Sequence, residues 1–264
     1  MQRALLEAVL LGVLCAVTGV VVLLRRQAFA VDALSHTVFP GLAIGFAAGD
    51  HLFIGACIAA ASSILLLSLL ARVRRLDGDS ILAVLIASFV AVGVAVVSRR
   101  PSFQSDLDDL LFGRLLTVDR VAIIETAAVG IVVLAIVAAL SKELVLVSFD
   151  VETAMAQGFH VGVIDVALNA IVAATVVVAA QTVGAALTVP MVVLPAAIAR
   201  TISERLGRIV AVAIAVGVAG GVGGLAVAYQ LSVTGNVRVG PSAAITVLLT
   251  LAFCGGLATR RWRT

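Results

Sequence analysis

Charged residues are scarce in this sequence, and their scarcity excludes a water-soluble protein. Of the 264 residues, 12% are Asp, Glu, Lys or Arg, whereas soluble domains carry roughly 25%. Apolar residues make up 62%, and the mean hydropathy is +1.22. A chain of this length accommodates about nine membrane-spanning helices of roughly 20 residues each. The composition therefore predicts an all-α, polytopic membrane helix bundle without a sizeable water-soluble domain.

Several motifs that would indicate other functions are also missing. The three cysteines, Cys15, Cys57 and Cys254, lie in apolar runs without paired spacing, so neither a disulfide framework nor a thiolate metal site is expected. No basic stretch carries interleaved aromatic residues, which argues against nucleic-acid binding. There is no GxxxxGK[ST] phosphate-binding loop, no HExxH motif and no Ser-Lys arrangement. We therefore expect no enzymatic activity, and any ATP-driven work requires a partner subunit.

Nine apolar runs are candidate membrane spans, and we treat residues 1–264 as a single transmembrane domain. The runs cover residues 5–24, 28–48, 52–71, 81–98, 121–140, 163–181, 184–199, 209–229 and 241–259. Pro40, Pro190 and Pro195 fall inside these runs. Because proline removes a backbone donor, we expect each of them to kink its helix.

The distribution of basic residues predicts the orientation of the chain. If the connection after the first run faces the cytoplasm, 12 of the 18 basic residues lie on the cytoplasmic side and 6 lie outside. The positive-inside rule then predicts an external N-terminus and a cytoplasmic C-terminus, which an odd number of spans satisfies.

Two connections are longer than simple turns. The external one, residues 99–120, holds the apolar segment Leu110 to Leu116. Because this segment is too short to cross a membrane, we expect it to lie at the interface or to enter the membrane as a re-entrant element.

The internal connection, residues 142–162, contains a helix-capping pattern. Asp150 is placed to cap a short helix with Glu152 in its first turn, and Gly158 is placed to end it. A capped helix on the cytoplasmic side has the form of a docking element, although an ordinary amphipathic connector has the same pattern.

Asp32 and His36 are the ionisable residues that we expect inside the membrane, since almost every other charge lies at a span end. A charge within a span costs about 2.5 to 3.5 kcal/mol and marks a functional site by default. A spacing of four places both side chains on one helical face, where a carboxylate and an imidazole suit Mn, Fe or Zn. Alternatively, the two residues satisfy each other or a neighbouring helix. If two copies of the chain faced each other, a second Asp and His would complete the ligand set.

Asp50 and His51 lie at the external end of the second run. They are candidates for a metal entry site, and a solvated turn is the alternative interpretation.

Five segments in order carry a family resemblance. They are Arg25-Arg26 followed by DALSH at Asp32 to His36, LLFG at Leu110 to Gly113, DVETAMAQG at Asp150 to Gly158, VGAAL at Val183 to Leu187 with VLPAAIAR at Val193 to Arg200, and GPSAAI at Gly240 to Ile245. Over nearly its whole length the sequence resembles the integral membrane permease subunit of bacterial ATP-binding-cassette (ABC) importers for zinc, manganese and iron, the ABC-3 metal permease family.

This resemblance implies a type II ABC importer permease in the bacterial cytoplasmic membrane, without a covalently bound cofactor. Asp32 and His36 would line the metal pathway. The implied partners are an ATPase subunit that binds ATP, a second permease copy, with a homodimer favoured over a heterodimer, and an extracytoplasmic metal-binding protein. That protein would dock near Leu110 to Gly113 and the loops around Asp50 and Asn236. The helix that fits a cleft of the ATPase would comprise Asp150, Val151, Glu152, Thr153, Ala154, Met155, Ala156, Gln157 and Gly158.

The cargo is the least determined part of this prediction. The sequence HTVFPG from His36, with Pro40 four residues after the histidine, resembles manganese and iron members of the family more than zinc members. Manganese is therefore favoured as the cargo, and zinc or iron stays open. Pro190 stands where the family has a small residue, which implies a more bent seventh span. Two other functions remain at this point: an ion-coupled secondary carrier that uses Asp32 and His36 as a proton relay, and a permease for chelated iron.

Overall fold

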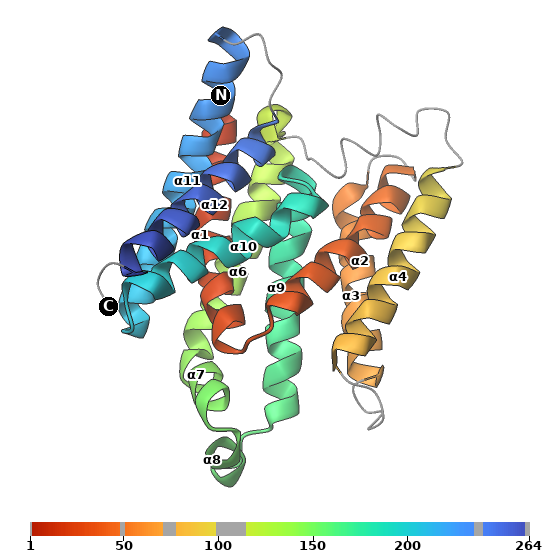
Figure 1. Cartoon of the computed structure of the whole chain (residues 1–264). Helices are drawn as coiled ribbons and strands as arrows, with labels where there is room; N and C mark the ends of the chain where they lie inside the picture. The colour runs from red at the N-terminus through yellow and green to blue at the C-terminus, as the bar shows by residue number, and fades with distance from the viewer. Residues whose placement is uncertain (1, 48–50, 71–77, 99–114, 235–239, 262–264) are drawn as a thin grey trace.

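The computed structural model describes residues 2–47, 51–70, 78–98, 115–234 and 240–261 (Figure 1). These residues form helices and no strand. The helices are α1 (Gln2–Leu24), α2 (Ala28–Ala47), α3 (Leu52–Leu70), α4 (Gly78–Val97), the 3-10 turn η1 (Leu115–Thr117), α6 (Arg120–Ala139), α7 (Ser141–Phe149), α8 (Val151–Ala156), α9 (Val161–Thr182), α10 (Ala185–Ile202), α11 (Leu206–Thr234) and α12 (Pro241–Arg261).

The predicted all-α membrane fold is confirmed, and each of the nine apolar runs corresponds to one helix. Six helices, α1, α2, α3, α6, α9 and α11, are long and apolar enough to cross a membrane. The apolar parts of α4, α10 and α12 are shorter. The helix α8 lies where the capping pattern predicts a short helix, and α7, which that pattern does not predict, directly precedes it.

The helices pack as two groups around a central pair. In Figure 1, α2, α3 and α4 lie on one side, α1, α10, α11 and α12 lie on the other, and α6 and α9 stand between them. The helix α2 contacts α3, α4, α9 and α10, so it connects the two groups. The helices α7 and α8 project from one end of the bundle (Figure 1).

Glycines allow two of these helix pairs to approach closely. A Cβ atom on Gly217 of α11 would lie 2.6 Å from the carbonyl oxygen of Gly12 on α1, and one on Gly41 of α2 would lie 2.3 Å from that of Gly55 on α3. Both distances are shorter than any real Cβ contact, so only glycine fits. Small residues at such crossings are the usual way to pack helices in lipid, because lipid tails leave little hydrophobic drive for association.

The three prolines lie within continuous helices. The helix α2 includes Pro40, and α10 includes both Pro190 and Pro195. The kinks at these positions stay a prediction.

Candidate functional site

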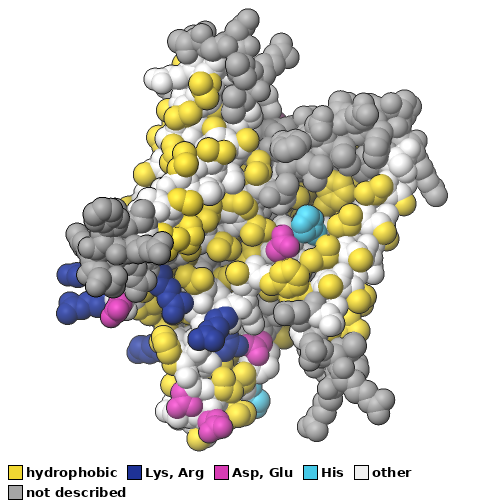
Figure 2. All heavy atoms as spheres, viewed as in Figure 1, with side chains coloured by type: hydrophobic (Ala, Val, Ile, Leu, Met, Phe, Trp, Pro, Cys, Tyr) yellow, Lys and Arg dark blue, Asp and Glu magenta, His cyan; other side chains and the backbone are white. Residues whose placement is uncertain are grey.

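Asp32 and His36 lie one turn apart on α2, as their spacing predicts. The His36 Nε2 atom is 3.5 Å from the Asp32 Oδ1 atom, and the two side chains are 37% (Asp32) and 38% (His36) exposed. Figure 2 shows an acidic and a histidine side chain beside each other over α2, among hydrophobic side chains. The pair is therefore accessible from outside the chain at a position where its surroundings are apolar.

The neighbouring hydroxyl groups do not complete a metal site. The Ser35 hydroxyl donates to the Asp32 carbonyl oxygen at 2.8 Å, and the Thr37 hydroxyl donates to the Leu34 carbonyl oxygen at 3.0 Å. Among the described residues, no group of three or more His, Cys, Asp or Glu side chains is arranged to hold a metal ion. Within the part of the chain that the structure describes, a single copy thus offers a divalent cation one carboxylate and one imidazole on this face.

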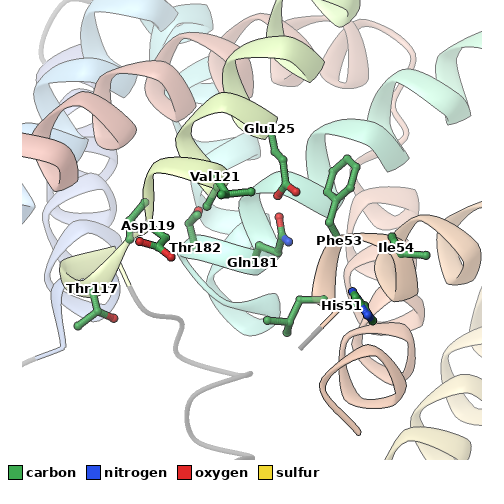
Figure 3. Close-up of a pocket in the computed structure, with 12 residues that line it drawn as sticks. His51, Phe53, Ile54, Thr117, Asp119, Val121, Glu125, Gln181 and Thr182 are labelled. Atoms are coloured by element: carbon green, nitrogen blue, oxygen red, sulfur yellow. The ribbon is translucent and has the colours of Figure 1, made fainter. Parts of the chain in front are cut away.

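A second polar location is a cavity of about 520 Å³ between α3, α6 and α9. The side chains of Glu125 on α6 and Gln181 on α9 both line it and point toward each other across it (Figure 3). His51 lies at the rim, directly before α3, and Asp119 lies at the start of α6. The structure thus brings His51, one of the two predicted entry residues, to a cavity that also contains carboxylates.

The cavity also shows what sequence reasoning missed. The expectation that the remaining charges lie at span ends is wrong for Glu125, which stands four residues inside the fifth run. Gln181, which faces Glu125 across the cavity, lies 56 residues further along the chain, so sequence proximity gives no signal that the two residues meet. Asp50, the other predicted entry residue, lies outside the described residues.

The expectation that Asp32 and His36 are the ionisable residues within the spans was incomplete. Glu7 of α1 is fully buried. Its Oε1 atom accepts a hydrogen bond of 2.7 Å from the Thr126 hydroxyl of α6, and its Oε2 atom has no hydrogen-bond partner among the described residues. Glu7 follows the start of the first run by two residues, which was the signal available in the sequence. It acts as a buried link between α1 and α6.

The predicted cap of the internal helix is confirmed. Asp150 lies at the N-cap of α8, where its Oδ1 atom accepts a hydrogen bond of 2.9 Å from the Thr153 backbone N–H. Hydrogen bonds from the Thr153 hydroxyl and backbone hold the pKa of Asp150 below its ordinary range. Gly158 has a φ of +86°, a conformation that suits glycine at the end of a helix.

The helix α8 presents a mixed surface at the end of the bundle. Ala154 is fully buried, whereas Val151 and Met155 are exposed, as is Phe149 at the end of α7. On the face seen in Figure 2, Lys and Arg side chains gather in the lower left part of the bundle, and the tip where α7 and α8 lie shows acidic side chains. This end therefore combines exposed apolar side chains with acidic ones, and positive charge lies nearby.

The predicted docking surface for a binding protein stays a prediction. Leu110 to Gly113, Asp50 and Asn236 all lie outside the described residues.

Comparisons with known proteins agree with these features. The sequence matches the ABC 3 transport family over residues 1–260. It is 33% identical to the manganese transport system membrane protein MntC of Halalkalibacterium halodurans, covering 100% of this chain and 91% of that protein. It is 30% identical to the chelated iron transport system membrane protein YfeC of Yersinia pestis, covering 100% and 90%.

A solved structure shares the fold as well as the sequence. The structure of PsaBC from Streptococcus pneumoniae in complex with Fab superposes with a TM-score of 0.84 at 27% identity, covering 97% of this chain and 90% of that one. Sequence and fold lead to the same assignment: the chain belongs to the ABC 3 transport family.

Proposed function

We propose that this chain is the membrane permease subunit of an ATP-driven importer for divalent transition metal ions, with manganese as its cargo. The observation that carries the proposal is the Asp32–His36 pair, a carboxylate and an imidazole held 3.5 Å apart on an accessible face of a membrane helix. These two ligand types suit Mn, Fe and Zn. The choice of manganese is supported by the name of the Halalkalibacterium relative and by a Streptococcus gordonii relative, a manganese import system permease protein that is 31% identical over 94% of this chain.

A second copy of the chain would complete the site. One copy supplies two ligands, and both are more than one-third exposed. Two copies related by an axis along the membrane normal would place two carboxylates and two imidazoles around one divalent ion. Such a site forms only in the assembled permease, and its half-exposed ligands favour release as well as binding, as a transport pathway requires.

The ATPase subunit would dock on α8. Exposed Val151 and Met155 offer an apolar surface to a cleft, and Asp150 fixes the helix by its cap. With α8 on the cytoplasmic side, the orientation is that of the positive-inside rule, with an external N-terminus and a cytoplasmic C-terminus. The cavity at His51 and Glu125 then opens at the external end, where an extracytoplasmic metal-binding protein delivers the ion.

The test uses the complete importer in vesicles: the permease, its ATPase and its metal-binding protein. Asp32→Asn and His36→Ala should each abolish most ATP-dependent uptake of radiolabelled manganese. The control Glu204→Gln removes one carboxylate at an exposed position between α10 and α11 and should leave uptake unchanged. Unchanged transport by both site variants would refute the metal pathway.

The same vesicles distinguish the alternative functions. Uptake that follows a proton or sodium gradient without ATP would indicate a secondary carrier. A permease for chelated iron is the second candidate function, because the Yersinia relative is named for chelated iron transport. Uptake of an iron chelate that manganese does not inhibit would support this function.

Coupling has its own test at the first turn of α8. Glu152→Arg reverses a charge that favours the start of this helix, and it should uncouple ATP hydrolysis from manganese uptake. Coupling equal to that of the wild type would count against docking at α8.

A further inference from the structure

Arg25 connects three helices at the end of the bundle that carries α8. It follows the last residue of α1, and its side chain is 10% exposed. One terminal nitrogen, Nη1, donates to the Val147 carbonyl oxygen of α7 at 2.9 Å. The other, Nη2, forms an ion pair with Asp165 of α9. A single guanidinium group thus joins the corner between α1 and α2 to α7 and α9.

The Val147 contact lies on a continuous path from α8. Asp150 ends α7 and begins α8: its N–H donates to the Leu146 carbonyl oxygen at 2.8 Å, and its carbonyl oxygen accepts from the Ala154 N–H at 3.1 Å. The Val147 side chain is buried. A displacement of α8 therefore moves the last turn of α7, and with it one of the two acceptors that hold Arg25.

Through the backbone, Arg25 is also connected to α2, the helix that carries Asp32 and His36. The turn at the end of α1 is closed by hydrogen bonds from the Arg26 and Gln27 N–H groups to the carbonyl oxygens of Leu23 and Val22, at 3.3 and 3.0 Å. The helix α2 begins at Ala28. Because the turn is short and hydrogen-bonded, a movement of Arg25 also moves the start of α2.

We propose that Arg25 is the positioning residue that couples movement of α8 to α2, through its simultaneous bonds to Val147 on α7 and Asp165 on α9. The inference rests on the proposed function, since it assumes that an ATPase moves α8. It goes beyond that function by naming the residue that carries the movement. Arginine suits this role because its planar group holds two acceptors at once, whereas the lysine ammonium is a single point charge.

The test compares Arg25→Lys with Arg26→Lys in the importer reconstituted in vesicles. Both substitutions keep the charge, but Arg26 is exposed and serves as the matched control. We expect Arg25→Lys to hydrolyse ATP while the manganese imported per ATP falls by about fivefold to a hundredfold, the usual range of coupling between sites. Arg26→Lys should keep the wild-type ratio.

A milder variant covers the case in which Arg25→Lys fails to assemble. Asp165→Asn keeps an acceptor for Nη2 but removes the ion pair, and it should lower the same ratio in a complex that melts near the wild-type temperature. If the assembled variants stay within about twofold of the Arg26→Lys ratio, coupling does not pass through Arg25.

A distance measurement separates failure of this inference from failure of the proposed function. Spin labels at Phe29 and Lys142, both exposed, report on the starts of α2 and α7 in a background without native cysteines. Their separation should change on ATP binding in the wild type and stay constant in Arg25→Lys, whatever the cargo is. Absence of manganese uptake by the wild type would refute the proposed cargo, whereas an equal distance change in both proteins would refute the role of Arg25.

Discussion

Replacing Gly217 with alanine tests whether backbone contact between α1 and α11 holds this bundle together. The new Cβ atom would lie 2.6 Å from the Gly12 carbonyl oxygen and 3.4 Å from the Ala16 Cβ atom. The matched control is Gly223→Ala on the same helix, where the nearest atom is the Leu248 Cδ1 at 3.6 Å, an ordinary contact distance. The two substitutions are chemically identical, so they differ only in what the added methyl group meets.

The expected magnitudes follow from these distances. In both variants alanine gains about 0.8 to 1.0 kcal/mol of helix propensity over glycine. Ordinary contacts begin at 3.4 Å, so Gly217→Ala requires α1 and α11 to separate by about 0.8 Å, which forfeits a quarter to a half of the attraction across the gap. Overpacking of this kind costs about 1 to 3 kcal/mol. We therefore expect Gly217→Ala to be about 1 to 3 kcal/mol less stable than Gly223→Ala.

Thermal unfolding of the purified permease in detergent, followed by size-exclusion chromatography of a fluorescent fusion, measures this difference. A change of 1 kcal/mol corresponds to about 2 to 4 °C for a chain of this size. Gly217→Ala should thus melt at least about 2 °C below Gly223→Ala. Equal melting temperatures would refute the argument, because they would mean that the crossing of α1 and α11 has room for a side chain.

Three further predictions concern single contacts. Thr126→Val should destabilise the permease in the wild-type background and much less in a Glu7→Leu background, because the double-mutant cycle isolates an interhelical hydrogen bond of about 0.6 to 1.7 kcal/mol; additive melting shifts would contradict the bond. Asp150→Ala should speed hydrogen exchange in the first turn of α8, whereas Asp150→Asn should not, and equal exchange in both variants would count against the cap. Since the pKa of Asp150 is lowered in the folded protein, the cap is present at neutral pH and is lost as the pH falls through that lowered value. Arg26 has a φ of +55°, so Arg26→Gly should be more stable than Arg26→Ala by about 1 kcal/mol in thermal unfolding, and the reverse order would contradict a left-handed turn there.

The spans and the local features of this protein were predictable from sequence because they depend on neighbouring residues. Hydropathy identifies a membrane helix from a run of about 20 residues. The cap at Asp150 depends on Thr153, three positions away, and the Asp32–His36 pair depends on a spacing of four. In each case the interacting groups belong to one helix, so their spacing in the sequence determines how they lie relative to each other.

Contacts between helices were not predictable in the same way. In a membrane both the lipid-facing and the buried sides of a helix are apolar, so the pattern does not show which side meets which neighbour. The Glu7–Thr126 bond joins residues 119 positions apart, and the Arg25–Asp165 pair joins residues 140 positions apart. The motif that includes Arg25 and Arg26 indicated that this corner is distinctive, but only the structure shows that the Arg25 side chain is 10% exposed whereas Arg26 lies at the surface.

The position of Asp32 on α2 suits the coupling proposed above. It lies four residues beyond the start of α2, which is about 6 Å along the helix axis. The helix α2 contacts both helix groups, so a tilt at its first turn changes how Asp32 and His36 face a second copy while the Gly41–Gly55 contact with α3 restrains the far half. A ligand set shared between two copies is disrupted by a small rotation of either one. In the proposed importer, joining the corner before α2 to α8 would give the ATPase control of metal affinity without any direct contact with the metal.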